Sequence, residues 1–524
     1  MINQSDKHSL SSGEGWGKAT SLSSGEGRNE VLHLSNLSFK HGKIDVFSNL
    51  NWIVKKGENW ALGGVSGSGK TALAKAIIGD LDVAGSVETN FDLTSSLRPE
   101  TLYVESWYQF KNVEGVANFY YQQRYTSQQA KETLTVNAEL AHFGKEKSLN
   151  LSDTKSLINA LGFAELSNSQ LIELSSGEHK KLQLVKALWL QPQLLIIDQP
   201  YTGLDAASRK NLNRLLDNAA EKGTTLILIS NDEELPSCVN RYAAIANGKL
   251  KILDSAPSSD FAEADLQREL PKFLKQAPVY QSEQIAKMVN VNISYGNKKV
   301  LKNINWEVKA GEKWLLQGHN GSGKSTLLSL INGDHPQSYA NELYLFGKKR
   351  GSGESIWDIK QHIGLISPEF HWYFDSNATV WESVASGLYD SVGLFARLPY
   401  SKAKQVDETV EYFGLTDCKN ERLANLPLGK QRLVLLARTV IKNPELLILD
   451  EPCQGLDKAQ TEYFNHLVSE LSQHGMTIIY VGHFEAQLPK CLSKKLVLSH
   501  GEVIKNENII KEDKAKDSTV TVQF

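Results

Sequence analysis

Residues 318–325 read GHNGSGKS, and residues 64–71 read GVSGSGKT. Both match the pattern GxxxxGK followed by Ser or Thr. In this pattern the glycines let backbone N–H groups curl around a phosphate, the lysine reaches its oxygens, and the hydroxyl holds Mg²⁺. A strand-like apolar run enters each loop and a helix-forming run leaves it, so two nucleotide sites are predicted. The expected nucleotide-binding residues of the loops are Gly64, Ser66, Gly67, Ser68, Gly69, Lys70, Thr71, Gly318, Asn320, Gly321, Ser322, Gly323, Lys324 and Ser325.

The two halves of the chain repeat one another. Lys324 follows Lys70 by 254 residues, and Asp450 follows Asp198 by 252 residues. A period of this length is a whole domain rather than a solenoid unit, so the sequence predicts two similar domains joined by a connector. The expected divisions are a disordered tail at residues 1–28, a first domain at 29–256, a linker at 257–284, a second domain at 285–509 and a tail at 510–524.

An apolar run that ends in aspartate occurs in each half, as LLIID at residues 194–198 and LLILD at residues 446–450. Continuous apolar runs of this length are typical of strands that are buried on both faces of a sheet. A carboxylate at the end of such a strand can hold Mg²⁺ together with the hydroxyl of the phosphate loop. The alternative is a plain core strand. The expected metal-binding residues are Thr71, Asp198, Ser325 and Asp450.

A third motif lies between the loop and the acidic strand, as LSSGE at residues 174–178 and LPLGK at residues 426–430. GLD follows the acidic strand at residues 203–205 and at 455–457. This order of motifs resembles the ATP-binding-cassette (ABC) ATPases over most of both halves. The resemblance implies an α/β fold of two P-loop NTPase domains. Each would have a mixed-sheet core and a helical subdomain, and the two would form a head-to-tail pseudo-dimer.

In that family each ATP lies between the phosphate loop of one cassette and the signature motif of the other, at a helix N-terminus that favours anions. The resemblance therefore implies ATP and Mg²⁺ as ligands and intramolecular pairing of the two cassettes. It also implies that Ser175 and Gly177 contact the nucleotide held by the opposite loop. Tyr295 stands where the family stacks an aromatic ring on adenine, and the first half offers His41 with Phe39 nearby. An ordinary core or surface aromatic is the alternative.

The second cassette has a complete set of catalytic groups. By the resemblance, Glu451 is the carboxylate that polarises the attacking water, His483 is the switch histidine that senses the γ-phosphate, and Lys324 is the loop lysine. The matching positions of the first cassette hold Gln199 and Asn231. Because an amide cannot accept a proton from water, the first cassette is expected to hydrolyse ATP slowly.

The signature motifs repeat this inequality across the pair. LSSGE keeps its serine hydroxyl, whereas Pro427 and Leu428 replace the serine and the first glycine in the second half. With head-to-tail pairing, all the losses fall on the composite site that contains Lys70. We therefore expect this site to hold ATP rather than to hydrolyse it. Independent drift at each position is the alternative.

Three segments of the second half resemble one subfamily: GDHPQSY at residues 333–339, LFG at 345–347 and RGSGESIWDIK at 350–360. They resemble the ModF-like tandem ATP-binding proteins, which are associated with molybdate transport or photorepair. The resemblance implies the ATP-binding component of a molybdate-type transporter. Its candidate partners are membrane permease subunits, placed against helical subdomains near residues 105–170 and 365–420.

The alternative function is a soluble ABC ATPase that acts on a ribosome, a nucleic acid or a repair complex without a permease. A nucleotide-gated scaffold without catalysis is a third hypothesis. The loop glutamine that usually senses the γ-phosphate is a poor match, since Pro368 and Glu369 stand at its position in the second half and Gln109 is only a candidate in the first. This departure counts against coupling to a permease of the usual type.

Composition limits the expected binding partners and the expected cellular location. The 524 residues are 41% hydrophobic and 22% charged, with a formal net charge of −3, so no stable nucleic-acid binding is expected. The four scattered cysteines are expected as free thiols in a reducing cytoplasm. No apolar run approaches the roughly 18 residues of a membrane span, and residues 1–28 lack the pattern of a secretory signal. The expected location is the cytoplasm, or the inner face of the cell membrane beside a permease.

Overall fold

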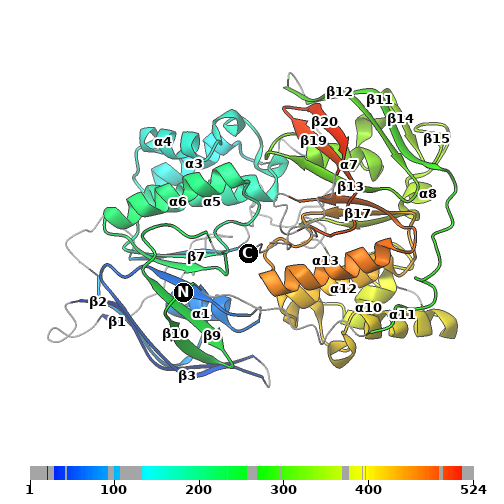
Figure 1. The fold of residues 1–524 in the computed structure, drawn as a ribbon. Helices are drawn as coiled ribbons and strands as arrows, with labels where there is room; N and C mark the ends of the chain where they lie inside the picture. The colour runs from blue at the N-terminus through cyan, green and yellow to red at the C-terminus, as the bar shows by residue number, and fades with distance from the viewer. Residues whose placement is uncertain are drawn as a thin grey trace, which may run out of the picture.

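The computed structural model describes residues 20–21, 29–41, 44–65, 67–91, 100–106, 133–232, 234–256, 268–295, 298–368, 374, 377–391, 393–395, 397–482 and 488–509. These residues form two copies of one architecture, the first running from blue to green and the second from green to red in Figure 1. Within the described part of the chain, no helix is long and apolar enough to cross a membrane.

Two sheets form the frame of the first cassette. A 4-stranded sheet has the order β1-β5-β2-β3, and a 6-stranded sheet has the order β10-β9-β4-β8-β7-β6. The larger sheet is parallel except for β10, which runs antiparallel to β9. The strands are β1 (Thr20–Ser21), β2 (Glu30–His41), β3 (Ile44–Lys55), β4 (Trp60–Gly63), β5 (Ala84–Thr89), β6 (Thr101–Val104), β7 (Leu194–Asp198), β8 (Thr225–Ile229), β9 (Arg241–Ala246) and β10 (Lys249–Leu253).

The helices of the first cassette follow the expected chain order. One of them leaves the phosphate loop, and the others lie on the far side of the larger sheet. They are α1 (Lys70–Ile77), α3 (Val136–Glu146), α4 (Thr154–Ala160), α5 (Ser176–Leu190) and α6 (Ala206–Glu221). Short 3-10 turns lie at η2 (Leu151–Asp153), η3 (Ala164–Leu166) and η4 (Leu171–Glu173). Asp205 caps α6 by accepting a hydrogen bond from the Ser208 N–H at 2.8 Å, which satisfies an amide that the helix leaves unpaired.

The second cassette repeats the two sheets, with orders β12-β11-β14-β15 and β16-β17-β18-β13-β19-β20. The larger sheet is again parallel except for its last strand, β20. The strands are β11 (Gln284–Tyr295), β12 (Lys298–Lys309), β13 (Lys313–Gly318), β14 (Glu342–Leu345), β15 (Lys348–Lys349), β16 (Ile363–Ile366), β17 (Leu446–Asp450), β18 (Thr477–Val481), β19 (Lys494–Ser499) and β20 (Glu502–Asn508).

Its helices also match those of the first copy in the described residues, and a short helix, α8, follows β15. They are α7 (Lys324–Ile331), α8 (Ile356–Lys360), α10 (Val380–Ser386), α11 (Tyr400–Tyr412), α12 (Leu428–Val440) and α13 (Lys458–Ser472). The 3-10 turns are η6 (Pro336–Ala340), η7 (Thr416–Cys418) and η8 (Leu423–Asn425).

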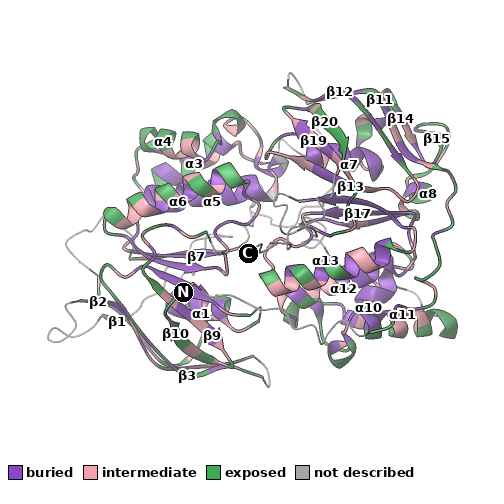
Figure 2. Cartoon of the chain, in the orientation of Figure 1, coloured by how far each residue is buried: buried purple, intermediate pink, exposed green. Residues whose placement is uncertain are grey.

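The acidic strands are the centre of each core, and they are buried along their whole length (Figure 2). In β7, Leu194 and Ile196 join the cluster beneath α1, while Leu195 and Ile197 join the cluster under the helical layer. Successive side chains of a strand point to opposite faces, so an apolar run without polar interruption is needed when both faces are covered. The same alternation in β17 explains the second apolar run.

The two cassettes lie head to tail, as predicted. In Figure 1 the helices α3–α6 of the first cassette lie beside the antiparallel sheet of the second, and α10–α13 of the second lie beside the antiparallel sheet of the first. Two contacts fix this arrangement. Asn320 of the second phosphate loop donates a hydrogen bond to the carbonyl oxygen of Gly203 at 2.7 Å, and a Cβ on Gly67 of the first loop would lie 2.6 Å from Pro427 Cγ.

The described part of the connector packs on the second cassette. Leu270 and Leu274 are buried in the core that contains α12, and the side-chain amide of Asn443 donates to backbone carbonyls of the connector. The Tyr280 hydroxyl donates to the carbonyl oxygen of Gly475. From residue 268 onward this segment is therefore an integral part of the second cassette's core.

The N-terminal segment differs from the expectation at one point. Thr20–Ser21 form β1 and pair in parallel with Glu88 and Thr89 of β5, whereas residues 1–28 were expected to be disordered. Backbone pairing along the open edge of β5 supplies the hydrogen bonds, and composition alone does not predict it. The rest of this segment lies outside the described residues.

Candidate active site

The second phosphate loop lies between β13 and α7. Gly321 and Gly323 have positive φ values of 77° and 103°, which other residues adopt only with strain. A Cβ on Gly318 would lie 2.4 Å from the carbonyl oxygen of Leu498, so only glycine fits here. Lys324 Nζ donates to the carbonyl oxygens of Gly318 at 2.8 Å and His319 at 3.2 Å. The loop is thus curled around its lysine, with the amides of the first turn of α7 left for an anion.

The first phosphate loop has the same geometry. Lys70 Nζ donates to the carbonyl oxygens of Gly64 at 2.6 Å and Val65 at 2.8 Å, and a Cβ on Gly64 would lie 2.5 Å from a backbone oxygen. Gly67 and Gly69 again have positive φ. Ser66 lies outside the described residues. Since both loops are intact, any difference between the two sites must come from the groups around them.

Side chains that fit Mg²⁺ meet at the end of β7. Thr71 Oγ1 donates to Asp198 Oδ2 at 2.6 Å, and the Tyr103 hydroxyl donates to the same oxygen at 3.2 Å. Burial raises the pKa of Asp198, and the hydrogen bond from Thr71 and the charge of Lys180 oppose this shift. A hydroxyl and a carboxylate are the hard oxygen donors that Mg²⁺ prefers, with substrate phosphates and water completing its shell. In the second cassette, Ser325 lies at the start of α7 and Asp450 at the end of β17, which are the positions of Thr71 and Asp198 in the first.

A buried lysine links α5 to the metal site of its own cassette. Lys180 is 2% exposed, and its Nζ donates to the backbone oxygens of Asp198 at 2.8 Å and Glu105 at 2.7 Å. Burial lowers its pKa to about 7. Lys180 therefore fixes the ends of β7 and β6 against the signature helix.

Glu451 and Gln199 are held in the same unusual backbone conformation. Their φ values are 44° and 52°, and their N–H groups donate to the last residues of the neighbouring strands, Val481 at 3.2 Å and Ile229 at 3.0 Å. A non-glycine residue in this left-handed region is uncommon and is often found at functional sites. The two cassettes therefore place different side chains at equivalent points.

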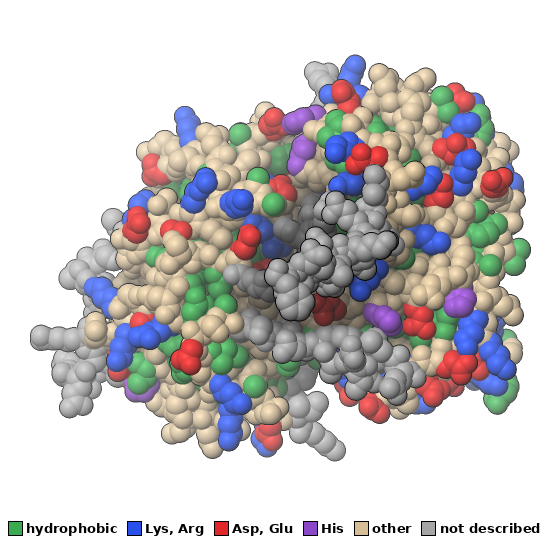
Figure 3. Space-filling model, viewed as in Figure 1, with side chains coloured by type: hydrophobic (Ala, Val, Ile, Leu, Met, Phe, Trp, Pro, Cys, Tyr) green, Lys and Arg blue, Asp and Glu red, His purple; other side chains and the backbone are tan. Residues whose placement is uncertain are grey.

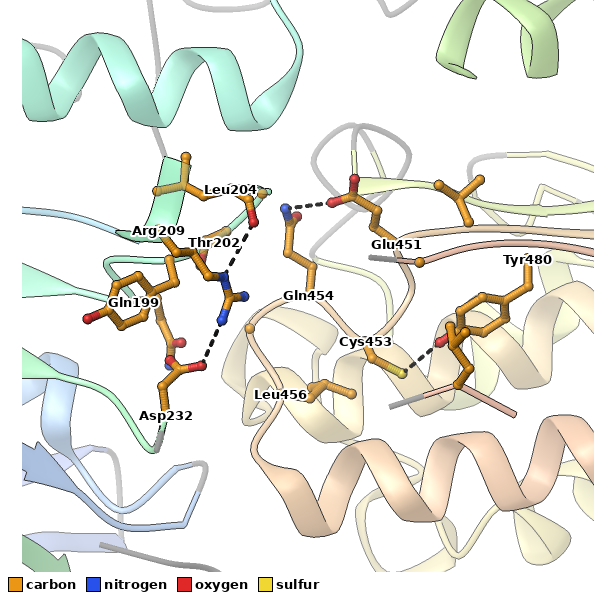
Figure 4. Close-up of a pocket in the computed structure, with 16 residues that line it drawn as sticks. Gln199, Thr202, Leu204, Arg209, Asp232, Glu451, Cys453, Gln454, Leu456 and Tyr480 are labelled. Atoms are coloured by element: carbon orange, nitrogen blue, oxygen red, sulfur yellow. Dashed lines mark hydrogen bonds and ion pairs between the residues drawn. The ribbon is translucent and has the colours of Figure 1, made fainter. Parts of the chain in front are cut away.

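The space between the cassettes is a cavity of about 120 Å³ to which both contribute. Figure 4 shows Gln454 lying between Glu451 and the first cassette. Gln454 Nε2 donates to Glu451 Oε2 at 3.2 Å, and a Cβ on Gly203 would lie 2.8 Å from the same nitrogen. On the opposite wall Arg209 forms an ion pair with Asp232 at 3.1 Å. Gln454 thus touches both the carboxylate and the opposite cassette. This role of Gln454 could not be predicted from the sequence, because a side-chain contact across a domain interface leaves no pattern in the order of residues.

Asn231 has a structural partner that explains its presence. Its Oδ1 accepts from the N–H of Gly64 at 3.0 Å, and its Nδ2 donates to the carbonyl oxygen of the same residue at 3.1 Å. The amide therefore pins the first phosphate loop to the end of β8. The corresponding residue of the second cassette, His483, lies outside the described residues.

The two signature helices begin differently. Ser175 caps α5 in a capping box, since its Oγ accepts from the Glu178 N–H at 3.4 Å and the Glu178 carboxylate accepts from the Ser175 N–H at 2.8 Å. Pro427 caps α12 without any side-chain hydrogen bond. Only the first motif therefore offers a hydroxyl at the helix N-terminus.

Each signature helix meets the phosphate loop of the opposite cassette. A Cβ on Gly177 would lie 2.0 Å from the carbonyl oxygen of Gly203 and 3.0 Å from Asn320 Nδ2, so the close approach requires glycine. The structure thus brings Lys324, Glu451, Ser175 and Gly177 around one site. Burial lowers the pKa of Lys324, and the carboxylates of Glu451 and Asp450 oppose that shift. Pro427 lies against Gly67 at the other site.

Tyr295 ends β11 at the tip of the β11–β12 hairpin. Its hydroxyl is 2.8 Å from His335 Nε2. The hairpin adjoins the second phosphate loop, because a Cβ on Gly323 would lie 2.7 Å from Leu301 Cδ2. The position is therefore suitable for an aromatic ring beside a nucleotide base. The candidate loop-glutamine positions Gln109 and Glu369 lie outside the described residues, and Pro368 follows shortly after β16.

The charged side chains on the visible face alternate in sign, with lysine and arginine mixed among aspartate and glutamate (Figure 3). Grey atoms cover the centre of this view, so it does not describe the interface itself. In the described residues no group of three or more His, Cys, Asp and Glu could hold a metal ion.

Comparison with known proteins agrees with this geometry. A family model described as "ABC transporter" matches residues 47–202 and again residues 301–454. The chain is 32% identical over 462 residues to "ABC transporter ATP-binding protein ModF" of Escherichia coli, covering 84% of this chain and 91% of that protein. It is 29% identical over 483 residues to an uncharacterized ABC transporter ATP-binding protein of Schizosaccharomyces pombe, covering 90% and 98%.

A further uncharacterized ABC transporter ATP-binding protein, from Saccharomyces cerevisiae, is 29% identical over 402 residues, covering 68% of this chain and 74% of that protein. The similarity therefore extends across both cassettes in relatives from bacteria and fungi. With both phosphate loops, both acidic strands and both signature helices in place, the chain belongs to the ABC transporter family as a tandem pair of ATP-binding cassettes.

Proposed function

We propose that the chain hydrolyses ATP at the composite site of Lys324 and holds ATP at the composite site of Lys70. The observation that carries this proposal is the equivalence of Glu451 and Gln199. Both occupy the same left-handed backbone position after the acidic strand, yet only one can act as a base. We name the site of Lys324 site two and the site of Lys70 site one.

At site two the residues have complementary roles. Glu451 accepts a proton from the attacking water, and Gln454 orients its carboxylate. Lys324 and the amides of the loop hold the β- and γ-phosphate oxygens. Ser175 and the N-terminus of α5 reach the γ-phosphate from the other cassette. Tyr295 stacks on the adenine, and His483 contacts the γ-phosphate.

Ser325 and Asp450 would hold Mg²⁺ at site two, as Thr71 and Asp198 would at site one. A bound Mg²⁺ would supply positive charge beside the phosphate oxygens. At site one the hydrogen bond from Thr71 Oγ1 to Asp198 Oδ2 places both donors on one side of the loop. These oxygen donors fit the ion without a histidine or cysteine cluster.

Because each nucleotide is contacted by both cassettes, ATP binds the closed pair more tightly than the separated one. This differential affinity drives closure, and loss of the γ-phosphate permits reopening. The hydrogen bond from Asn320 to the carbonyl oxygen of Gly203 couples the second phosphate loop to the first cassette.

Site one has three departures, and each has a physical consequence. Gln199 cannot accept a proton, and Pro427 offers no side-chain donor to a γ-phosphate. The side-chain amide of Asn231 is hydrogen-bonded to both the N–H and the carbonyl oxygen of Gly64. Independent drift would distribute such substitutions over both sites, whereas all three substitutions lie at site one.

Gln199→Glu is expected to raise total turnover by less than about twofold, since even a fully repaired site one would only match site two. The expected gain is smaller because Pro427 and Asn231 remain. Steady-state phosphate release measures it. Gln473→Glu, at an exposed helix end, introduces the same charge as a control. A rate near twice that of the unsubstituted protein would mean that the carboxylate alone was missing.

For the biological output we propose an ATP-binding component of a membrane transporter, of the ModF-like, molybdate-associated type, on the cytoplasmic face of a membrane. The relative from Escherichia coli is named an ABC transporter ATP-binding protein. In addition, the helical part of the second cassette exposes Phe395 at 89%, Tyr400 at 87% and Tyr389 at 47%. Exposed aromatics near one another in sequence suit a protein partner.

A soluble ATPase acting on another macromolecule is the second candidate. Pro368 stands where transporter-coupled members usually carry the loop glutamine, and it favours this alternative. The two candidates predict different partners for the same ATP-bound state.

The Glu451→Gln protein, trapped with ATP, should co-purify with a permease from the membrane fraction of native cells. Affinity capture from membrane and soluble fractions, followed by mass spectrometry, measures this. Lys324→Ala captured in parallel is the control, since it cannot form the trapped state at site two. Recovery of ribosomes, nucleic acid or a repair complex in place of a permease would overturn the transporter proposal in favour of the soluble one.

A further inference from the structure

The edge of β11 near Tyr295 is completed by side chains instead of a strand. β14 pairs with β11 only from Ala286 to Val289. Beyond that point the N–H of Asn292 donates to Asn341 Oδ1 at 2.9 Å, and the N–H of Ser294 donates to Gln337 Oε1 at 3.2 Å. Gln337 Nε2 also donates to the carbonyl oxygen of Ser294 at 2.7 Å. The side-chain amide of Gln337 therefore makes the two backbone hydrogen bonds that a neighbouring strand would make, next to Tyr295.

His335 holds the tyrosine itself. It is 1% exposed, and burial lowers its pKa to about 4, so the ring is neutral near pH 7. Nδ1 accepts from the N–H of Gln337 at 3.2 Å. Because a neutral imidazole has one donor and one acceptor, Nε2 carries the proton and donates it to the Tyr295 hydroxyl at 2.8 Å.

Both holding residues follow the helix that begins at the phosphate loop. α7 starts at Lys324, and His335 and Gln337 come at the start of η6 just beyond the end of that helix. One short segment thus carries the phosphate-binding lysine at one end and the support for the aromatic ring at the other. The distance between the two ends is therefore set by a rigid element.

The described residues that follow the phosphate-loop helix of the first cassette offer no such support. Residues 78–83 lead from α1 directly into β5 and contain neither histidine nor glutamine. There β5 itself continues along β2 as far as the pair Ser38 and Ala84. The longer connection of the second cassette, at residues 332–341, carries the side chains that hold Tyr295.

We propose that His335 and Gln337 form a clamp that positions Tyr295 against the adenine of the nucleotide at site two. This inference rests on the proposed function, because it assigns the support of the base to a site that binds ATP. Both are positioning residues, since they act through Tyr295 and touch no reacting atom. The clamp strengthens base recognition at site two without changing the chemical step.

The test uses a Lys70→Ala background, which silences site one. In that background we expect His335→Ala and Tyr295→Phe each to raise the Kd for ATP by about threefold to tenfold, the range expected for one lost hydrogen bond. The double variant should be no weaker than either single variant, because both changes break the same bond. The kcat should stay within about twofold.

Inorganic tripolyphosphate separates positioning from general damage. It carries the phosphates without a base, so its Kd should be unchanged in all three variants. His362→Ala removes a different half-buried histidine of the same cassette, which pairs with Glu445, and should change neither Kd. If His335→Ala does not fold, His335→Leu takes its place in the cycle with the same expectation, because it also removes the bond to Tyr295.

Additive losses in the double variant, or an equal loss of tripolyphosphate binding, would overturn the clamp. If the Lys70→Ala parent binds both ATP and tripolyphosphate but the losses in the variants are additive, the clamp alone is refuted. A parent that binds neither ligand refutes the proposed function of site two, and the clamp with it.

Discussion

We expect Glu451→Gln to slow phosphate release at least about a hundredfold, the typical loss when a general base is removed. The amide keeps the shape of the side chain but cannot accept a proton. The backbone will tolerate the change, because Gln199 already occupies the equivalent position with a φ of 52°, close to the 44° of Glu451. The variant should therefore retain ATP. Steady-state phosphate release, together with nucleotide retained after gel filtration, measures both properties.

Glu462→Gln is the matched control, because Glu462 is an exposed glutamate on α13 and should leave turnover unchanged. A Glu451→Gln protein that turns over at the unsubstituted rate would remove this carboxylate from the mechanism. In that case another carboxylate near the loop would have to act as the base, because the amide of Gln454 cannot accept a proton.

The fold was predictable because its decisive elements are local. A phosphate loop, an apolar strand that ends in aspartate and a signature motif each occupy fewer than about ten residues. Their repetition after about 250 residues then implied two cassettes, and resemblance to the family supplied the head-to-tail pairing. Asn320 and Gly177 were both expected at the nucleotide, and the structure places them in contact across the interface.

What the sequence did not predict depends on how the chain turns locally and on contacts between distant segments. The bond from Gln454 to Glu451 needs the turn after β17 to bring position 454 back over position 451. The two bonds between Asn231 and Gly64 join segments 167 residues apart. From the sequence Asn231 was only a missing histidine, and the structure shows that it holds the loop.

The support of Tyr295 is an intermediate case. The run at residues 333–339 was recognised only as a subfamily feature, and His335 was not assigned a role. Its role depends on burial and on which nitrogen accepts a hydrogen bond, and neither can be read from residue order. An unusual run directly after a phosphate-loop helix was nevertheless a usable signal, because that helix end lies beside Tyr295.

Lys324→Ala should reduce turnover far more than Lys70→Ala, by at least about a hundredfold against less than about tenfold. The two lysines are a matched pair. They are 7% and 8% exposed, and each donates to the carbonyl oxygens of the first two residues of its own loop. Their loss should therefore destabilise the two cassettes to a similar degree, and thermal melting can confirm this. A difference in rate then reports the surroundings of each lysine.

Those surroundings differ in the groups that can carry out hydrolysis. Burial lowers the pKa of both lysines, and Glu451 is the foremost opposing charge at Lys324, whereas Asp198 is the foremost at Lys70. Of the two lysines, only Lys324 therefore has the proposed base, Glu451, as its foremost charged neighbour. Lys70→Ala should weaken ATP retention at site one while site two continues to turn over. Equal losses of rate, with equal melting temperatures, would instead mean that the two sites alternate in hydrolysis and that Gln199 does not disable site one.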